Sequence, residues 1–317
     1  MEKLKTKIIE KSRELGLTDI RFTDLNIDEV TKKNLLQWIE LGYSANMKYI
    51  PNNIDKRNNP QLILENAQSM IVCSLFYYPG NPPEINQNNY AKISRYAQGK
   101  DYHYILLDKI KILEGFIRKL IPEIQTKSYT DTGHILEKYF AQKSGIGWQG
   151  KNSLVISPEY GSYFFIGVIL TTYKFEKDQP IRDYCGTCVR CINACPTNAL
   201  VQPKVLDANA CIAYWTVEAK PDEEIPDNVK KANTEWIFGC DICQEVCPYN
   251  RKLSDITNVS DFINPNNFYF DIDKIDNFSK EDFDIRFTKS PVKRRKYEGF
   301  IKNAKALIEN KQNKSKT

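Results

Sequence analysis

The sequence predicts a mixed α+β protein in three parts: an α/β region over residues 1–175, a cysteine-rich region over residues 176–252 and a short helical, basic tail over residues 253–317. Two observations carry this prediction. The first region alternates helix-like with strand-like segments and contains one of the nine cysteines, whereas the other eight lie between residues 185 and 247. A length of 317 residues also suits more than one domain, since a domain takes about 150 residues.

Apolar periodicity defines the elements of the first region. Helical spacing stops at Gly16 and again at Gly42, as expected of glycines that follow a helix. A nearly continuous apolar run is typical of a buried strand, and Cys73 within one is a candidate core residue. The expected order is a helix at 3–15, a strand at 19–23, a helix at 30–41, a strand at 69–78, a helix at 103–120, a strand at 124–130, a helix from about 134, and strands at 153–157 and 163–172.

Asp131 follows directly on the strand expected at 124–130. Binding loops collect at strand ends in α/β sheets, which places Asp131 for chemistry. An aspartate before a helix can equally be an ordinary N-cap. The local sequence leaves both interpretations open.

A glycine-rich turn, Gly145-Ile-Gly147-Trp148-Gln-Gly150-Lys151-Asn152, joins a helix to the next strand. It is not a Walker motif, because Lys151 is not followed by Ser or Thr. The region also lacks a G-x-G-x-x-G run after a strand, which argues against a dinucleotide site. Backbone N–H groups in such a turn could instead hold polar groups of another cofactor.

The cysteine-rich region begins Cys185-Gly-Thr-Cys188-Val-Arg-Cys191-Ile-Asn-Ala-Cys195-Pro196, the spacing of two-cluster ferredoxins, in which the fourth cysteine ligates the other cluster. A second run, Cys240-Asp-Ile-Cys243-Gln-Glu-Val-Cys247-Pro248, is one ligand short, since Ile237 stands where a cysteine is expected. Two other interpretations of these cysteines fit less well: structural zinc favours pairs of C-x2-C rather than a run of this spacing, and a disulfide framework suits a short secreted chain. We therefore predict two 4Fe–4S clusters, one held by Cys185, Cys188, Cys191 and Cys247 and the other by Cys195, Cys211, Cys240 and Cys243.

Composition and charge limit the class of protein and its expected cellular location. A hydrophobic content of 41% suits globular cores, and no apolar run approaches the ~20 residues of a membrane span. Residues 1–7 lack the apolar core of an export signal, so we expect a cytoplasmic protein. The net charge of +5 permits an anionic partner without requiring one. The run from Lys293 to Lys296 is the best candidate for phosphate contact, although such runs are most often solvated faces.

Two clusters move single electrons, and a carrier needs no α/β region of about 175 residues. Several motifs in that region and beyond occur in a fixed order: Asp55-Lys-Arg57, Ser94-Arg95-Tyr96-Ala-Gln-Gly-Lys-Asp101-Tyr102-His103, Asp131-Thr-Gly133, Ile135-Leu-Glu137-Lys138, Gly145-Ile-Gly-Trp-Gln-Gly-Lys151-Asn152-Ser153 and Cys240-Asp-Ile-Cys-Gln-Glu-Val-Cys-Pro. Together they resemble the epoxyqueuosine reductase family, from the first helix to about residue 306.

The resemblance implies reduction of the epoxide of epoxyqueuosine, at the wobble position of tRNA anticodons, to the alkene of queuosine. It implies a nitroreductase-like N-terminal domain that binds cobalamin, as cob(II)alamin, and a ferredoxin-like domain that delivers electrons. Reductive dehalogenases share this arrangement of cofactors. The implied partners are the tRNA anticodon stem-loop and an external one-electron donor such as flavodoxin or ferredoxin, with the chain acting as a monomer and without a membrane.

The resemblance also assigns residues. Asp131 becomes the proton donor, and burial beneath the corrin would have to raise its pKa above the ordinary value of about 3.9. His103 is not implied as a cobalt ligand, since the family leaves the lower face of cobalt without a protein histidine. His134 departs from the family's Asp-Thr-Gly-Pro turn, which leaves the detail of that turn open. The implied corrin contacts are Arg57, Arg95, Tyr102, His103, Asp131, Lys151, Asn152 and Ser153.

Two alternatives remain at this point. One is a cobalamin and iron–sulfur reductase of the reductive-dehalogenase type that acts on a small molecule, although such proteins usually carry a twin-arginine export signal. The other is a non-catalytic electron-transfer protein, which would need neither an acid at Asp131 nor affinity for tRNA. Longer family members add a helical-repeat segment that helps to hold tRNA, so here the basic surface would have to do more.

Overall fold

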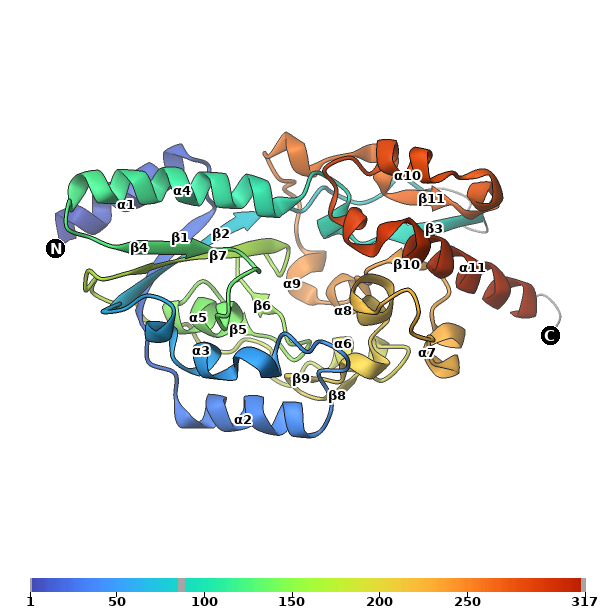
Figure 1. Cartoon of the computed structure of the whole chain (residues 1–317), viewed down its shortest axis with the longest axis horizontal. Helices are drawn as coiled ribbons and strands as arrows, with labels where there is room; N and C mark the ends of the chain where they lie inside the picture. Colours follow the sequence, from blue (N-terminus) through green and yellow to red (C-terminus); the bar gives the residue numbers. More distant parts are fainter. Residues whose placement is uncertain (1, 85–88, 315–317) are drawn as a thin grey trace. The chain divides into compact units, whose positions relative to one another are not determined.

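The computed structural model describes residues 2–84 and 89–314 and divides into two compact units (Figure 1). The first unit comprises residues 1–76 and 102–188, and the second comprises residues 77–101 and 189–317. The contact boundaries therefore differ from the expected limits at 175 and 252. The three functional domains stay a prediction, and residues 315–317 of the expected tail lie outside the described part.

The first unit is built on a four-stranded sheet of order β1-β2-β7-β4, in which every neighbouring pair is antiparallel. The mixed α+β prediction is confirmed, but this sheet lacks the parallel pairing that an α/β region would have. The elements are α1 (Glu2–Glu14), β1 (Asp19–Asp24), α2 (Glu29–Glu40), α3 (Ile54–Asn58), β2 (Ser69–Phe76), α4 (Tyr102–Leu120), β4 (Thr126–Tyr129), α5 (Glu137–Ser144), β5 (Trp148–Gln149), β6 (Val155–Ile156) and β7 (Phe164–Thr171).

Helices cover both faces of this sheet (Figure 1). α4 packs on β7 at Gly167, where a Cβ would lie 2.2 Å from the Cδ1 atom of Ile110, so only glycine allows the close approach. On the other face α5 closes a core that includes Val72, Phe140 and Val168. Cys73 is fully buried in β2, which confirms it as a core residue, and burial raises the pKa of its thiol to about 12.

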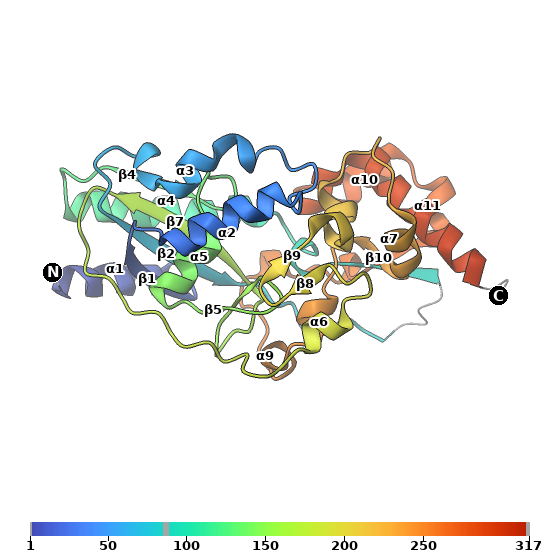
Figure 2. The same cartoon turned by 90° about the horizontal axis from the view of Figure 1, so that it is seen from below.

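α2 lies on the α5 side of the sheet, along the outside of the first unit (Figure 2). The helix contains no buried residue, and Val30 and Leu36 are 68% and 44% exposed. Its apolar residues therefore contribute little to the core, in contrast to the amphipathic packing expected from the sequence.

The second unit has a three-stranded sheet of order β10-β3-β11. The tail is part of this unit: β11 pairs with β3, and Phe283 and Phe300 from the tail pack with Ile93 and Phe238 in one core. The elements are β3 (Tyr90–Ile93), α6 (Arg190–Ala194), β8 (Leu200–Gln202), β9 (Val205–Leu206), the π-helix η6 (Tyr214–Glu218), α7 (Asp227–Ala232), β10 (Trp236–Phe238), α8 (Ile242–Glu245), α9 (Pro248–Arg251), β11 (Tyr269–Asp271), α10 (Lys280–Arg286), η10 (Pro291–Arg295) and α11 (Lys296–Lys314). In the described part of the chain, no helix is both long and apolar enough to cross a bilayer.

Candidate functional site

Cysteines from three separate segments converge in the second unit, where α6 packs on α8. Cys243 lies within electrostatic range of Cys211, Cys191 and Cys195, and Cys240 lies within range of Cys243 and Cys211. Burial, reinforced by these neighbouring sulfurs, raises the pKa of the Cys240 and Cys243 thiols. Thiolates crowded in this way need positive charge nearby, which the iron of a cluster would provide.

Cys185 and Cys188 belong to the first unit, and Cys191 and Cys247 belong to the second. The sulfur of Cys185 accepts a hydrogen bond from the indole N–H of Trp148 at 3.3 Å. Hydrogen bonds to cluster sulfurs are one of the features that set the reduction potential. Within residues 2–84 and 89–314, no three His, Cys, Asp or Glu side chains stand close enough to hold a single metal ion. Ligands at the corners of a cube stand farther apart than those of one ion.

Asp241 ties the second cysteine turn to the segment that precedes α4. Its carboxylate accepts hydrogen bonds from the Ser94 hydroxyl, from the Arg95 backbone N–H at 2.8 Å and from Arg95 Nη1 at 3.3 Å. Arg95 Nη1 also lies 2.6 Å from Glu245 Oε1. Arg95, an expected corrin contact, thus lies buried in the second unit, where its guanidinium is committed to two carboxylates.

Asp131 stands at the end of β4 in the first unit, in a tight turn closed by the hydrogen bond from Thr132 N–H to Thr130 O. Its φ of +57° is left-handed, which residues other than glycine seldom adopt. The Oδ2 atom accepts a hydrogen bond from the Tyr102 hydroxyl at 2.9 Å and lies 3.5 Å from His103 Nε2. The Asp131 side chain is 54% exposed, so the chain itself does not supply the burial that the sequence argument requires.

Glu137, in the first turn of α5, accepts a hydrogen bond from the Asp131 backbone N–H at 2.8 Å. Burial, followed by the charge of Asp131, raises the pKa of Glu137 to about 8, while the Asp131 N–H, His103 and Arg57 act in the opposite direction. Glu137 was not among the site residues predicted from the sequence. A signal was available, because the residue opens a helix six positions after Asp131 and belongs to one of the quoted motifs.

The polar side chains of the glycine-rich turn differ in whether they find hydrogen-bond partners within the protein. The Lys151 ammonium donates to the Gly186 carbonyl at 2.7 Å, and Asn152 is buried and accepts from the Leu154 N–H at 3.3 Å. Ser153 has a left-handed φ of +64°, and its buried hydroxyl has no hydrogen-bond partner among the residues that the structure describes. The buried Nε of Arg57 also has none. Arg57 and Ser153 therefore keep polar capacity for a bound group.

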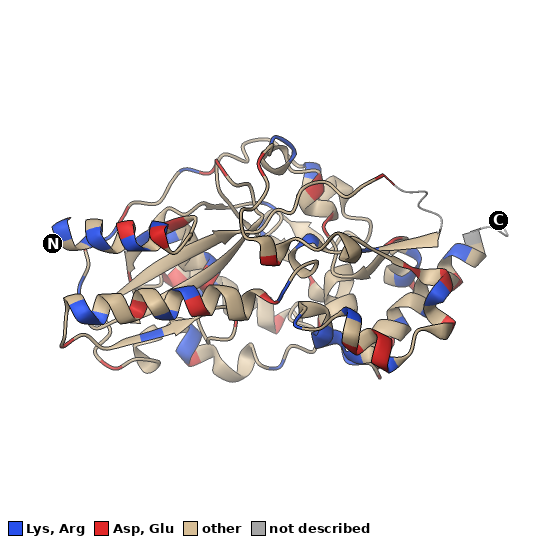
Figure 3. Ribbon diagram, turned by 90° about the horizontal axis from the view of Figure 1, so that it is seen from above, with Lys and Arg blue, Asp and Glu red and all other residues tan. Residues whose placement is uncertain are grey.

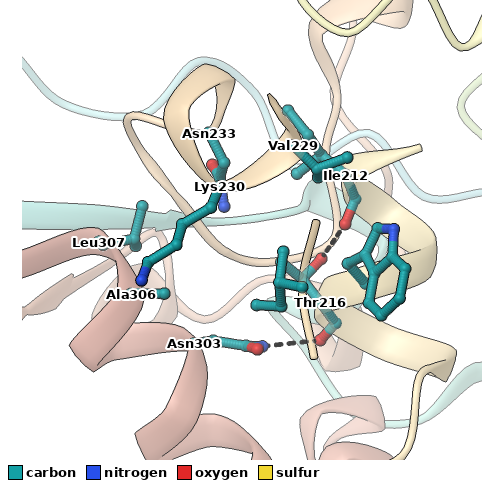
Figure 4. A pocket seen from close by; sticks show the side chains of 10 residues that line it. Ile212, Thr216, Val229, Lys230, Asn233, Asn303, Ala306 and Leu307 are labelled. Atoms are coloured by element: carbon teal, nitrogen blue, oxygen red, sulfur yellow. Dashed lines mark hydrogen bonds between the residues drawn. The ribbon is translucent and has the colours of Figure 1, made fainter. Parts of the chain in front are cut away.

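A small cavity in the second unit is a packing gap rather than a cofactor site (Figure 4). Its volume of about 10 Å³ holds no more than one water molecule. Asn303 beside it donates to the carbonyls of Thr216 at 3.0 Å and Ile237 at 2.9 Å, and the Thr216 hydroxyl donates to the Ile212 carbonyl at 2.8 Å. These bonds join α11 to the π-helix η6 and satisfy buried carbonyls.

The basic run before α11 is mostly engaged within the protein. Arg295 is 3% exposed and donates to the Ala219 carbonyl and to Asn303, so it does not contribute to a phosphate-binding surface. Lys293 pairs with Asp284 at 2.7 Å, and Arg294 pairs with Glu218 at 2.8 Å. Basic and acidic positions alternate along the ribbons of α1 and α11 rather than being gathered by sign (Figure 3).

Comparison with known families defines the class of protein. Residues 184–250 match the model of a 4Fe-4S double cluster binding domain, which confirms the two-cluster prediction. Residues 57–132 match the model described as epoxyqueuosine reductase QueG, DUF1730. The chain is therefore an iron–sulfur oxidoreductase with a distinct N-terminal domain.

Whole-chain relatives identify the family. The epoxyqueuosine reductase of Synechocystis sp. is 40% identical over 306 residues, which cover 93% of this chain and all of the relative. The crystal structure of an epoxyqueuosine reductase with an epoxyqueuosine-modified tRNA-Tyr stem loop aligns with a TM-score of 0.91 at 31% identity, over 99% of this chain and 83% of the other. The Bacillus subtilis epoxyqueuosine reductase, captured with its catalytic aspartate loop swung out of the active site, aligns over the same shares at 30% identity and a TM-score of 0.91. The chain belongs to the epoxyqueuosine reductase family.

Proposed function

We propose that the protein reduces epoxyqueuosine to queuosine at the wobble position of tRNA anticodons, with Asp131 as a proton donor. Conversion of an epoxide to an alkene breaks two C–O bonds and consumes two electrons and two protons, and the oxygen leaves as water. Oxygen is a poor leaving group unless it is protonated, so the site needs an acid. The observation that carries the proposal is the placement of Asp131 beside Tyr102 and His103 in a chain of this family.

The electrons come from two 4Fe–4S clusters, each held by four thiolates. Our proposed ligand sets are Cys185, Cys188, Cys191 and Cys247 for one cluster, and Cys195, Cys211, Cys240 and Cys243 for the other. The grouping of Cys211, Cys240 and Cys243 in the second unit supports the latter set. An external one-electron donor such as flavodoxin or ferredoxin would recharge the clusters.

Cobalamin is the proposed cofactor of the first unit, where it would supply a low-potential cobalt centre for the reduction. The periphery of a corrin carries amide groups, which pair with unsatisfied protein donors. Arg57 Nε and Ser153 Oγ are buried without partners, so these two residues fit the group. Arg95 and Lys151 fit less well, since one pairs with carboxylates and the other with a backbone carbonyl.

Asp131 lies in a strained, half-exposed turn, as expected of a group that meets a macromolecular substrate. Tyr102 orients its carboxyl group and is itself held against the ring of Phe165, with ring centroids 4.0 Å apart. We also propose that this turn corresponds to the mobile aspartate loop of the Bacillus subtilis relative. A monomeric state and a cytoplasmic location stay predictions.

The test is turnover after anaerobic reconstitution with iron, sulfide and cobalamin, on an anticodon stem-loop that carries epoxyqueuosine. Mass spectrometry should find that the nucleoside has lost one oxygen atom. Asp131→Asn should keep both cofactors and turn over about 100-fold more slowly or worse, the usual loss for a general acid. Full occupancy of clusters and cobalamin without loss of oxygen would reject the proposal in favour of a small-molecule reductase or an electron carrier.

A further inference from the structure

The reaction leaves one proton without a source. The reduction consumes two protons, and a single aspartate supplies one before it must be recharged. Tyr102 and His103 contact the Asp131 carboxyl group from the α4 side, whereas Glu137 contacts the Asp131 backbone from α5. A second carboxyl group therefore contacts the turn that carries the first.

Resting on the function proposed above, we infer that Glu137 is a positioning residue that holds the Asp131 turn through its backbone N–H and returns a proton to the Asp131 carboxylate during turnover. Asp131 gives the first proton to the departing oxygen and becomes a carboxylate. Glu137 then passes its proton to Asp131, which delivers it as the second proton, so that the oxygen leaves as water. Solvent finally returns two protons, one to Glu137 and one to Asp131, so that both groups are restored.

The geometry supports both parts of this role. The bond from Asp131 N–H to Glu137 Oε1 is 2.8 Å long and restrains a residue whose backbone is left-handed. The turn around Asp131 is closed by the bond from Thr132 N–H to Thr130 O, and Glu137 accepts the N–H at its centre. Only one Glu137 oxygen is used in this bond, and the other stays available to carry a proton.

Burial and the charge of Asp131 favour a protonated Glu137 side chain at neutral pH, against the opposing charges of His103 and Arg57. Asp131 faces it from the loop after β4, His103 from α4 and Arg57 from α3. Burial and the Asp131 carboxylate raise the pKa of Glu137 to about 8. Below this pH the group holds a proton that it can give, and above it the proton is lost, so turnover should fall as the pH rises through about 8.

Glu137→Gln separates the two parts of the role. Glutamine keeps an oxygen to accept the Asp131 N–H but has no proton to release, so turnover should fall about 100-fold while cluster and cobalamin contents stay unchanged. The fall of the rate above pH 8 should disappear in this variant. Exposed Glu123→Gln is the matched control, with wild-type turnover expected. A Glu137→Gln enzyme with wild-type rate and pH profile would overturn the inference and leave Glu137 as a hydrogen-bond acceptor only.

A second readout does not depend on turnover. Infrared difference titration of the holoenzyme should find a protonated carboxyl group that ionises near pH 8 in the wild type and at lower pH in Asp131→Asn, where the charge that raises its pKa is removed, and that is missing in Glu137→Gln. If wild type carries this group but leaves the stem-loop unchanged, the proposed function fails and the ionisation of Glu137 stands. If the stem-loop is reduced and no such group titrates, the inference on Glu137 fails while the proposed function stands. In that case, loss of turnover in His103→Asn together with full activity in Glu137→Gln would assign the second proton to His103.

Discussion

Replacing Asp241 with alanine should destabilise the second unit by about 3 kcal/mol or more, because it deprives the buried Arg95 guanidinium of a carboxylate partner. Asp241 is 1% exposed and Arg95 is 8% exposed. The carboxylate accepts bonds from the Ser94 hydroxyl, the Arg95 N–H and Nη1, and the Gln244 amide. Removing one partner of a buried pair costs about 3–5 kcal/mol, and the surviving bond from Arg95 to Glu245 places this case near the lower end.

The assay is thermal unfolding of the cluster-loaded chain under anaerobic conditions. With about 2–4 °C lost per kcal/mol in a unit of this size, the unfolding midpoint should fall by roughly 6–12 °C. Asp261→Ala is the matched control in the same unit: its pair with Lys100 is 2.7 Å long but about half exposed, so its loss should cost less than about 1 kcal/mol. Equal shifts for the two variants would refute the argument that burial, rather than pairing alone, sets the cost.

Two further changes test separate features. Gly145→Ala should lower the free energy of unfolding by at least about 2 kcal/mol, because φ is +88° and a Cβ would lie 2.4 Å from a backbone oxygen. Gly42→Ala, with φ of +71° and open space around the Cβ, should lower it by about 1 kcal/mol. Denaturant titration of both variants compares the two losses. Trp148→Phe removes the hydrogen bond from the indole N–H to the sulfur of Cys185, so the midpoint potential of one cluster should become more negative. A redox titration followed by electron paramagnetic resonance measures both potentials. If neither potential changes, the hydrogen bond does not tune the cluster.

The sequence specifies the cluster ligands well because their spacing is local. Within C-x2-C-x2-C the chain geometry alone brings the sulfurs to one cluster, so no knowledge of the fold is needed. Cys211 could be assigned only because the second run lacks one ligand. The contacts that hold these turns are not local: Asp241 meets Arg95 across 146 positions, and Trp148 meets Cys185 across 37. Periodicity carries no information on such pairs.

The tail illustrates a different limit. A basic run and a helical pattern are visible in the sequence, but which of the basic side chains faces the core depends on the residues that pack against the run. Arg295 is buried because the carbonyl of Ala219 and the amide of Asn303 accept its guanidinium, whereas Lys293 and Arg294 stay partly exposed in ion pairs. A count of charges gives these three residues the same role, whereas their packing makes one of them a buried structural residue and leaves the other two at the surface.

The proton donor poses the sharpest contrast between sequence and structure. A proton donor at Asp131 was expected to be buried, yet this side chain is 54% exposed, and burial instead raises the pKa of Glu137. A carboxyl group that must reach a tRNA base has to stand at the surface, where water surrounds it. A carboxyl group behind it can be shielded and can hold a proton without touching the substrate. Division of the task between two residues thus lets one side chain meet the substrate while the other carries the proton, which a single exposed acid could not do.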